Sequence, residues 1–224
     1  MCGIVGYVGK NEAQGFLLSG LKRLEYRGYD SAGIVTVAED GVATLIRAKG
    51  KIGNLEDKLA KSRRSDNIGI GHTRWATHGE PSEENAHPHK AGDIYLVHNG
   101  IIENYKELKK ALVGHEFVSD TDSEVLAALI NSFYKNGKYP LMNAVVQALK
   151  LVKGTYGIAV VSNKNPEEIV VARSGSPLVI GVGHNETLIA SDTAALVGHT
   201  KRAIYLNDGE VSLTSHEQIA LFVV

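Results

Sequence analysis

Short apolar runs bounded by Gly, Asp or Asn dominate the first hundred residues of the chain. Residues 4–8 predict a strand, and apolar positions then recur at helical spacing after Asn11, which suits a helix cap. Further β-rich runs predict four strands, at residues 33–37, 43–48, 68–72 and 94–98. Between the last two lies a segment from about 75 to 92 that is longer than most connections, and such loops often bind ligands.

The pattern changes in the middle of the chain and then changes back. Helical spacing covers residues 104–112, 121–134 and 141–151, and Thr121 and Glu124 are spaced as a capping box. Turn-separated apolar runs then predict strands at residues 156–162, 169–172, 178–182, 187–191 and 203–206. Short strands with helices in blocks favour one α+β domain over residues 1–224, with helices covering antiparallel sheets. The apolar residues 219–224 suggest the cut edge of a longer protein.

Composition narrows the functional class. The 224 residues carry a formal net charge of −1, so no strong field favours nucleic acid or an anionic membrane as a partner. Apolar runs fall far short of the roughly 20 residues of a membrane helix, and the N-terminus lacks a secretory signal. One cysteine excludes an internal disulfide. A cytoplasmic protein is therefore expected.

That one cysteine, Cys2, follows the initiator methionine. If Met1 is removed, Cys2 presents a thiol and a free α-amine on one residue. Their ordinary pKa values, near 8.5 and about 7.7–8.0, allow the amine to take the thiol proton as attack begins. From position alone, an ordinary buried cysteine explains Cys2 equally well.

Motifs along the chain favour a nucleophilic Cys2 over an ordinary buried cysteine. In order, the sequence contains CGIVG at 2–6, RGYDSAG at 27–33, GHTRWATHG at 71–79, NAHPH at 85–89, HNGIIEN at 98–104, SDTDSE at 119–124 and RSGSPL at 173–178. Together they resemble the glutaminase domain of the glutamine–fructose-6-phosphate aminotransferases, which is a class II glutamine amidotransferase domain. The resemblance covers nearly the whole chain.

The resemblance implies an N-terminal-nucleophile hydrolase fold, an αββα sandwich with two antiparallel sheets between helical layers. It implies L-glutamine as substrate and no cofactor. It also implies that C-terminal synthase domains, which bind fructose 6-phosphate, belong to the same polypeptide and are absent from this chain. The full-length enzyme is expected to be a homo-oligomer.

Residue roles follow from the matched positions. Cys2 would be the nucleophile, and the Asn99 side chain and Gly100 N–H would stabilise the oxyanion. Arg74 would hold the glutamine α-carboxylate in a planar fork, and Asp122 would accept the α-ammonium. Taken alone, Asn-Gly also suits a hairpin turn, and a carboxylate at position 122 also suits a helix start.

Other matched residues carry supporting roles. Thr77 and His78 would contact glutamine or brace their loop. Arg27, Gly28 and His87 would support the site, and Trp75 would help to gate an ammonia passage, with core packing as its alternative.

Three other interpretations compete with this one. A metal site is one of them, because four histidines lie close together in the sequence: His72, His78, His87 and His89. No Cys or carboxylate ligands accompany these histidines at suitable spacing, so no metal site is expected. Within the superfamily, the chain could instead be the glutaminase half of a phosphoribosyl-pyrophosphate amidotransferase or an asparagine synthetase, although Trp75 and the following Thr77-His78-Gly79 favour the resemblance given above. A regulatory module that binds glutamine without turnover is the alternative from another class.

Overall fold

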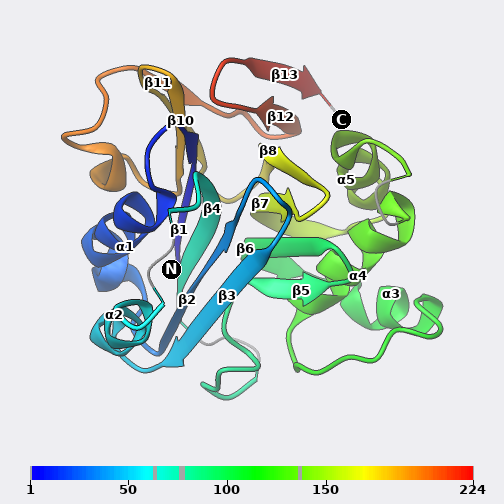
Figure 1. Ribbon diagram of the computed structural model, residues 1–224. Coiled ribbons are helices and arrows are strands. Elements are labelled where there is room, and N and C mark those ends of the chain that lie inside the picture. The colour runs from blue at the N-terminus through cyan, green and yellow to red at the C-terminus, as the bar shows by residue number, and fades with distance from the viewer. Residues whose placement is uncertain (1, 63–64, 76–78, 136–137, 224) are drawn as a thin grey trace.

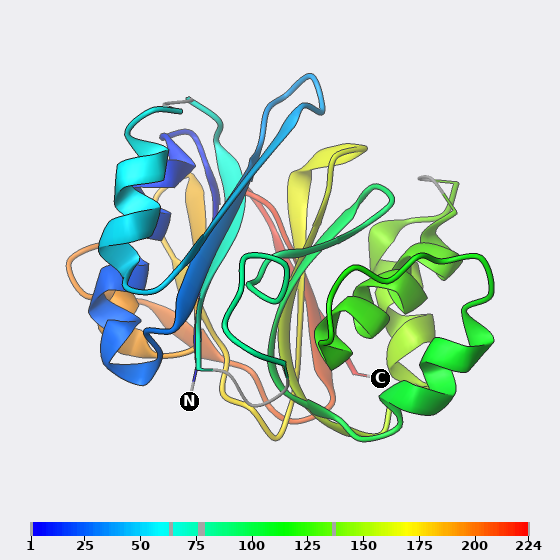
Figure 2. The ribbon, with the colours of Figure 1, turned by 90° about the horizontal axis from the view of Figure 1, so that it is seen from below.

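The structure, a computed structural model, describes residues 2–62, 65–75, 79–135 and 138–223. Within these residues the strands form two antiparallel sheets that pack face to face, and helices cover both outer faces (Figures 1 and 2). This arrangement is the αββα sandwich that the motifs of the sequence imply.

The first sheet has the strand order β11-β9-β10-β1-β4-β2-β3. Helices α1 and α2 cover its outer face, where Phe16, Leu17, Leu21 and Leu24 of α1 are buried as their spacing predicts. Short 3-10 helices, η1 and η2, follow α1 and β10. The bounds are β1 (Gly3–Gly9), α1 (Ala13–Leu24), η1 (Glu25–Arg27), β2 (Ser31–Val37), β3 (Ala43–Lys49), α2 (Ile52–Leu59), β4 (Ile68–Arg74), β9 (Val179–Val182), β10 (Glu186–Ala190), η2 (Thr193–Leu196) and β11 (Ala203–Tyr205).

The second sheet has the order β13-β12-β8-β7-β6-β5, and the remaining helices pack on it. Figure 2 shows these helices on the opposite side of the molecule from α1 and α2. The bounds are β5 (His89–Ala91), β6 (Ile94–Ile102), α3 (Tyr105–Ala111), α4 (Asp122–Tyr134), α5 (Leu141–Leu149), β7 (Gly154–Ser162), β8 (Asn165–Ser174), β12 (Glu210–Thr214) and β13 (Ile219–Val223).

Alternation along β1 shows how the layers are separated. Ile4 and Val8 point between the two sheets, whereas Val5 and Tyr7 pack beneath α1. Side chains of a strand alternate between faces, so β1 contributes to both apolar layers. The whole strand is buried, which explains its unbroken apolar sequence.

The pairing register of β1 and β4 determines where Cys2 lies. β1 runs antiparallel to β4, with Gly3 opposite Thr73, so the start of β1 lies beside the end of β4. Cys2 therefore lies next to the segment that follows Arg74. Strand β6 of the facing sheet brings Asn99 to the same end of the sandwich, where its side chain reaches the backbone of Cys2.

The predicted cap of α1 is wrong. The helix begins at Ala13, and no side chain caps it. The Ala13 N–H instead donates to the backbone carbonyl of Asp66, 2.9 Å away, while Asn11 turns its side chain to Glu186. A distant backbone acceptor thus satisfies a donor that a local cap would otherwise serve.

Helix α2 and strands β5, β12 and β13 were not predicted. Helix α2 is short and largely polar, and β5 lies inside the segment predicted as a long loop. In addition, β6 continues through Asn99 and Gly100, so this pair forms no hairpin turn. Residues 219–223, predicted as a cut edge, form a strand that pairs with β12.

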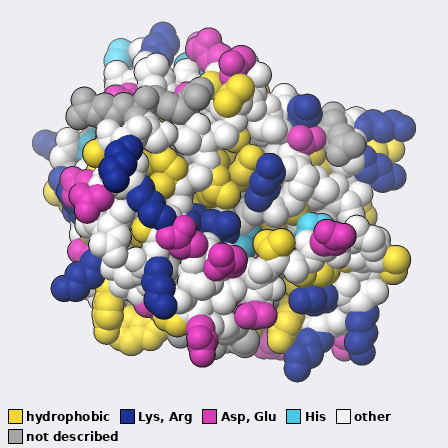
Figure 3. Space-filling view, turned by 60° about the horizontal axis from the view of Figure 1, so that its bottom comes forward, with side chains coloured by type: hydrophobic (Ala, Val, Ile, Leu, Met, Phe, Trp, Pro, Cys, Tyr) yellow, Lys and Arg dark blue, Asp and Glu magenta, His cyan; other side chains and the backbone are white. Residues whose placement is uncertain are grey.

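The surface carries both charges. On the face in Figure 3, acidic and basic side chains are interspersed. No helix in the described part of the chain has the length and apolar character needed to cross a membrane.

Candidate active site

A cavity of about 260 Å³ lies beside Cys2. Its size is near the lower end for small-molecule sites and suits a ligand as small as an amino acid. Most of the predicted site residues line it: Cys2, Arg27, Arg74, Trp75, His87, Asn99, Gly100 and Asp122. Thr77 and His78 lie outside the described residues.

The Cys2 thiol is held against the chain after β4. The Trp75 N–H donates to Cys2 Sγ at 3.2 Å. Burial raises the pKa of the Cys2 thiol above its ordinary value, and the Trp75 N–H partly opposes this. At neutral pH the thiol therefore keeps its proton, and a nucleophilic role for it would require a base. Met1, whose removal would free that base, lies outside the described residues.

Gly28 packs directly against the backbone of Arg74 and Trp75, beside the N–H that contacts Cys2. A Cβ at position 28 would lie 2.8 Å from the Arg74 carbonyl carbon and 3.0 Å from the Trp75 nitrogen. The chain after η1 can therefore approach the end of β4 only with glycine at this position.

Arg27 supports the site from the side. Its Nη1 donates to the Ser191 carbonyl and to the Asp192 carboxylate, each at 3.2 Å. The Ser191 hydroxyl in turn accepts the Ile4 N–H at 2.9 Å. Arg27 thus fixes the end of β10 against the start of β1, close to Cys2.

Asn99 and Gly100 lie at the opposite wall. Asn99 Nδ2 donates to the Cys2 carbonyl at 3.1 Å, and its Oδ1 lies 2.9 Å from His72 Nε2. Gly100 has φ +135°, and a Cβ there would lie 2.0 Å from the Thr155 carbonyl oxygen. Only glycine fits this strained strand position.

Arg74 and Asp122 bring opposite charges to the cavity. Burial lowers the pKa of Arg74, and the charges of Asp30, Cys2 and Asp122 oppose that shift. Asp122, the first residue of α4, accepts the Ile102 N–H at 2.7 Å. A cation and an anion on one small cavity match the two charged groups of a free amino acid.

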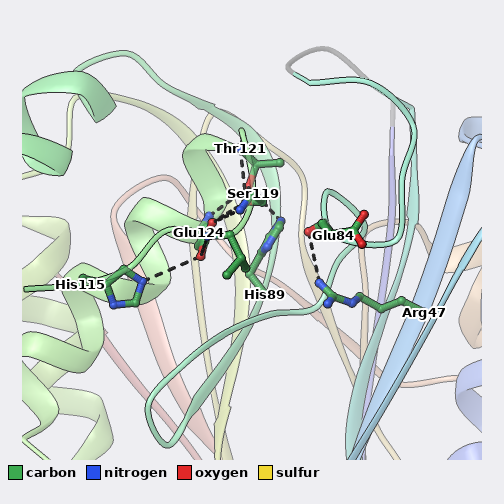
Figure 4. A network of polar contacts seen from close by, with 8 residues as sticks. Arg47, Glu84, His89, His115, Ser119, Thr121 and Glu124 are labelled. Atoms are coloured by element: carbon green, nitrogen blue, oxygen red, sulfur yellow. Dashed lines mark hydrogen bonds and ion pairs between the residues drawn. The ribbon is translucent and has the colours of Figure 1, made fainter.

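A buried polar network fixes the start of α4 (Figure 4). The Thr121 hydroxyl caps the helix by accepting the Glu124 N–H, as predicted. The Glu124 carboxylate does not return to Thr121; it accepts the Ser119 N–H at 2.7 Å and the Ser119 hydroxyl at 2.6 Å. His89 Nε2 lies 2.9 Å from the Thr121 hydroxyl. These contacts hold the turn that presents Asp122.

The loop before β5 is tied down from two sides. Arg47 of β3 donates to the carbonyl of Glu84 at 3.2 Å (Figure 4) and to the carbonyl of Ala86, also at 3.2 Å. Asn85 Oδ1 accepts the Asp120 N–H at 2.9 Å, next to the start of α4. Neither Arg47 nor His89 was among the predicted site residues, because their partners are distant in sequence.

His72, His87 and His89 pack edge to face. Burial lowers the pKa of His72 to about 3, and burial with neighbouring positive charges lowers the pKa values of His87 and His89 well below the ordinary value. The three imidazoles are therefore neutral near pH 7. In the described ranges no three His, Cys, Asp or Glu side chains are placed as metal ligands.

Trp75 is half-exposed, at 49%, and its ring lies edge-on to Tyr29 with 5.4 Å between centroids. The core-packing alternative for Trp75 is therefore wrong. The side chain instead stands at the rim of the cavity.

Comparison with known proteins decides the family. Residues 56–219 match the family described as a glutamine amidotransferase domain. The chain belongs to the class II glutamine amidotransferase family. A glutamine–fructose-6-phosphate aminotransferase (isomerizing) of Chlorobaculum tepidum is 54% identical over 97% of this chain, and one of Clostridium tetani is 50% identical over 99%. The chain spans 36% of the length of each of these two relatives.

Solved structures agree with the assignment of this chain to the amidotransferase family. The glutamine phosphoribosylpyrophosphate amidotransferase from B. subtilis, complexed with ADP and GMP, has a TM-score of 0.84 and 30% identity. That match covers 99% of this chain and 49% of the other. A class II domain protein from Silicibacter pomeroyi, at 15% identity and TM-score 0.68, shares the fold.

Proposed function

We propose that this amidotransferase domain hydrolyses the side-chain amide of L-glutamine through a thioester on Cys2. The observation that carries the proposal is the cavity itself. This cavity of about 260 Å³ is lined by four residues that the proposed reaction needs: Cys2, Asn99, Arg74 and Asp122.

Catalysis begins at the Cys2 thiol. The free α-amine takes the proton from Sγ, and sulfur bonds to the amide carbon of glutamine. The carbonyl oxygen becomes an oxyanion, which the Asn99 Nδ2 and the Gly100 N–H stabilise. The protonated amine, directly or through water, returns the proton to the leaving nitrogen, the C–N bond breaks and ammonia departs. Water then attacks the thioester, so that glutamate leaves and the thiol is restored.

Recognition uses both ends of the free amino acid. The Arg74 guanidinium pairs with the α-carboxylate through two parallel hydrogen bonds, and the Asp122 carboxylate accepts the α-ammonium. Thr77 and His78 complete the glutamine contacts. Arg27, Gly28 and His87 keep the walls of the site in place.

The longer relatives suggest what happens to the ammonia. In a full-length polypeptide, C-terminal synthase domains would use it to convert fructose 6-phosphate to glucosamine 6-phosphate, and Trp75 at the rim would gate its passage. That polypeptide would be homo-oligomeric. The single cysteine supports a cytoplasmic location.

The competing activities receive less support. Identity is 54% to a glutamine–fructose-6-phosphate aminotransferase and 30% to a phosphoribosylpyrophosphate amidotransferase structure. A module without turnover would have no use for a nucleophile, an oxyanion donor and a charged clamp around one cavity.

Release of glutamate and ammonia from glutamine tests the proposal. The wild-type domain should produce both in equal amounts, and Cys2→Ala should produce neither. Gly53→Ala is the control, since it adds a methyl group on α2 with nothing within 4 Å and should retain full activity. Equal turnover by wild type and Cys2→Ala would refute the nucleophile, and absence of wild-type turnover would favour the binding module.

A further inference from the structure

His72 is fully buried and takes no part in the mechanism above, yet it contacts the proposed oxyanion donor. It lies on β4, two residues before Arg74, and reaches across to Asn99 on β6 of the facing sheet. The distance from His72 Nε2 to Asn99 Oδ1 is 2.9 Å. The contact therefore joins the two sheets directly behind the site.

The chemistry of the partners fixes which atom donates. The Cys2 carbonyl can only accept, so the Asn99 nitrogen must face it, as the 3.1 Å contact requires. The Asn99 oxygen then faces His72, and an amide oxygen can only accept. His72 must therefore carry its hydrogen on Nε2.

The surroundings keep His72 in that form. His87 meets the ring edge-on, with its Nδ1 3.1 Å from each His72 ring nitrogen. Burial has the largest effect on the pKa of His72 and lowers it to about 3; the hydrogen bonds to Asn99 and to the His98 backbone oppose that shift, and the charges of His98 and Arg74 add to it. A neutral imidazole has one N–H, for which the Asn99 oxygen competes with the His98 backbone, and the orientation of the Asn99 amide assigns it to Nε2.

We propose that His72 is a positioning residue whose Nε2–H fixes the Asn99 amide with its nitrogen turned toward Cys2 and the oxyanion. Without this donor, only the contact with the Cys2 carbonyl restrains the Asn99 amide, and the side chain can more readily rotate and present its oxygen to a developing negative charge. This inference rests on the proposed function, because it assigns Asn99 to the oxyanion.

A double-mutant cycle tests the positioning role. His72→Phe keeps a ring of similar shape without a donor, and it should lower kcat by about 10- to 100-fold with little change in KM, since part of one oxyanion donor is lost. His72→Gln, which can place an N–H near the same point, should recover much of the rate. In an Asn99→Ala background, His72→Phe should cost little more. An equal loss in both backgrounds, or a change in KM alone, would overturn the proposal.

A measurement on the wild-type protein separates this inference from the proposed function. ¹⁵N NMR of the His72 ring should show the Nε2–H tautomer throughout pH 6–8, and the Asn99 side-chain amide resonances should move in His72→Phe. The Nδ1–H tautomer would refute the positioning contact even if glutamine is hydrolysed. The expected tautomer without any glutaminase activity would leave the contact intact and refute the proposed function.

Discussion

At the scale of single residues, the proposed function assigns recognition and chemistry to different side chains. Arg74 and Asp122 supply opposite charges, while Cys2 and Asn99 lie where the side-chain amide would react. Burial raises the pKa of the Cys2 thiol, so the thiol carries its proton at neutral pH. Under the proposed function, the α-amine of the same residue takes that proton.

Asp122 gives a prediction about substrate recognition. Asp122→Asn keeps an oxygen that can accept the Ile102 N–H but removes the negative charge facing the α-ammonium. Its KM for glutamine should rise by about 10-fold or more, because a charge-assisted contact is worth roughly 1.5–3 kcal/mol. The analogue that lacks the α-amine, glutaramate, should be turned over equally by both proteins. Steady-state kinetics with both substrates measure this, and an equal penalty on both would refute the ammonium contact.

The buried histidines give a prediction about pH and stability. The folded-state pKa of His72, about 3, lies below its ordinary value of 6.5, so the unfolded chain binds the proton more readily. Its contribution to stability is full above pH 6.5 and declines as pH falls toward 3, by up to about 1.4 kcal/mol per pH unit. Urea unfolding at pH 7.5 and 5 should show this loss, and His72→Phe should show less of it. An unchanged difference in His72→Phe would contradict the assignment.

At the scale of elements, two close backbone approaches and one buried polar network shape the site. The chain after η1 runs against the end of β4 at Gly28, and β6 passes Thr155 at Gly100. Helix α4 begins on a buried network in which Glu124 binds Ser119 and a threonine hydroxyl caps the helix. Each of these fixes one wall of the cavity.

Gly28→Ala tests the first of these contacts. The new methyl carbon would lie 2.8 Å from the backbone of Arg74, so that segment must shift and move Trp75 away from Cys2. Glutaminase kcat should fall by about 100-fold, since a misplacement of about 1 Å can cost this much. Gly53→Ala on α2, where nothing lies within 4 Å, is the matched control and should be fully active and equally or more stable. Normal kcat in Gly28→Ala would show that the approach is not needed.

At the scale of the whole molecule, the sandwich gathers the starts and ends of strands from two sheets around one cavity. Most elements could be predicted from apolar runs and periodicity, whereas the αββα layering was implied by the resemblance of the motifs. The structure adds that Ile4 and Val8 face one apolar layer and Val5 and Tyr7 the other. The predicted Asn11 cap was wrong because a backbone carbonyl from a distant segment served α1 instead. A local sequence pattern cannot predict a hydrogen-bond partner that is distant along the chain.

The candidate site was predictable for a different reason. Cys2, Arg74, Asn99 and Asp122 belong to motifs, and the cavity brings all four together. His72 stands inside the same motif region but was considered only as a metal ligand, since its partner Asn99 lies on the other sheet. Only the packing of the two sheets reveals that contact.

The chain's share of its relatives' length gives a prediction for the isolated domain. Because it spans 36% of those relatives, we expect it to release ammonia from glutamine but to form no glucosamine 6-phosphate from fructose 6-phosphate. A coupled assay for the sugar product, run beside the glutamate assay, measures both. Detectable glucosamine 6-phosphate from this chain alone would contradict the assignment of synthase chemistry to other domains.

Rapid-quench mass spectrometry of the N-terminal peptide tests the central claim most directly. During turnover of glutamine, the peptide should begin at Cys2 and carry a transient glutamyl group on that residue, and Cys2→Ala should carry none. A glutamyl group on any other residue, or turnover by protein that retains Met1, would contradict catalysis by the Cys2 thiol and its own α-amine.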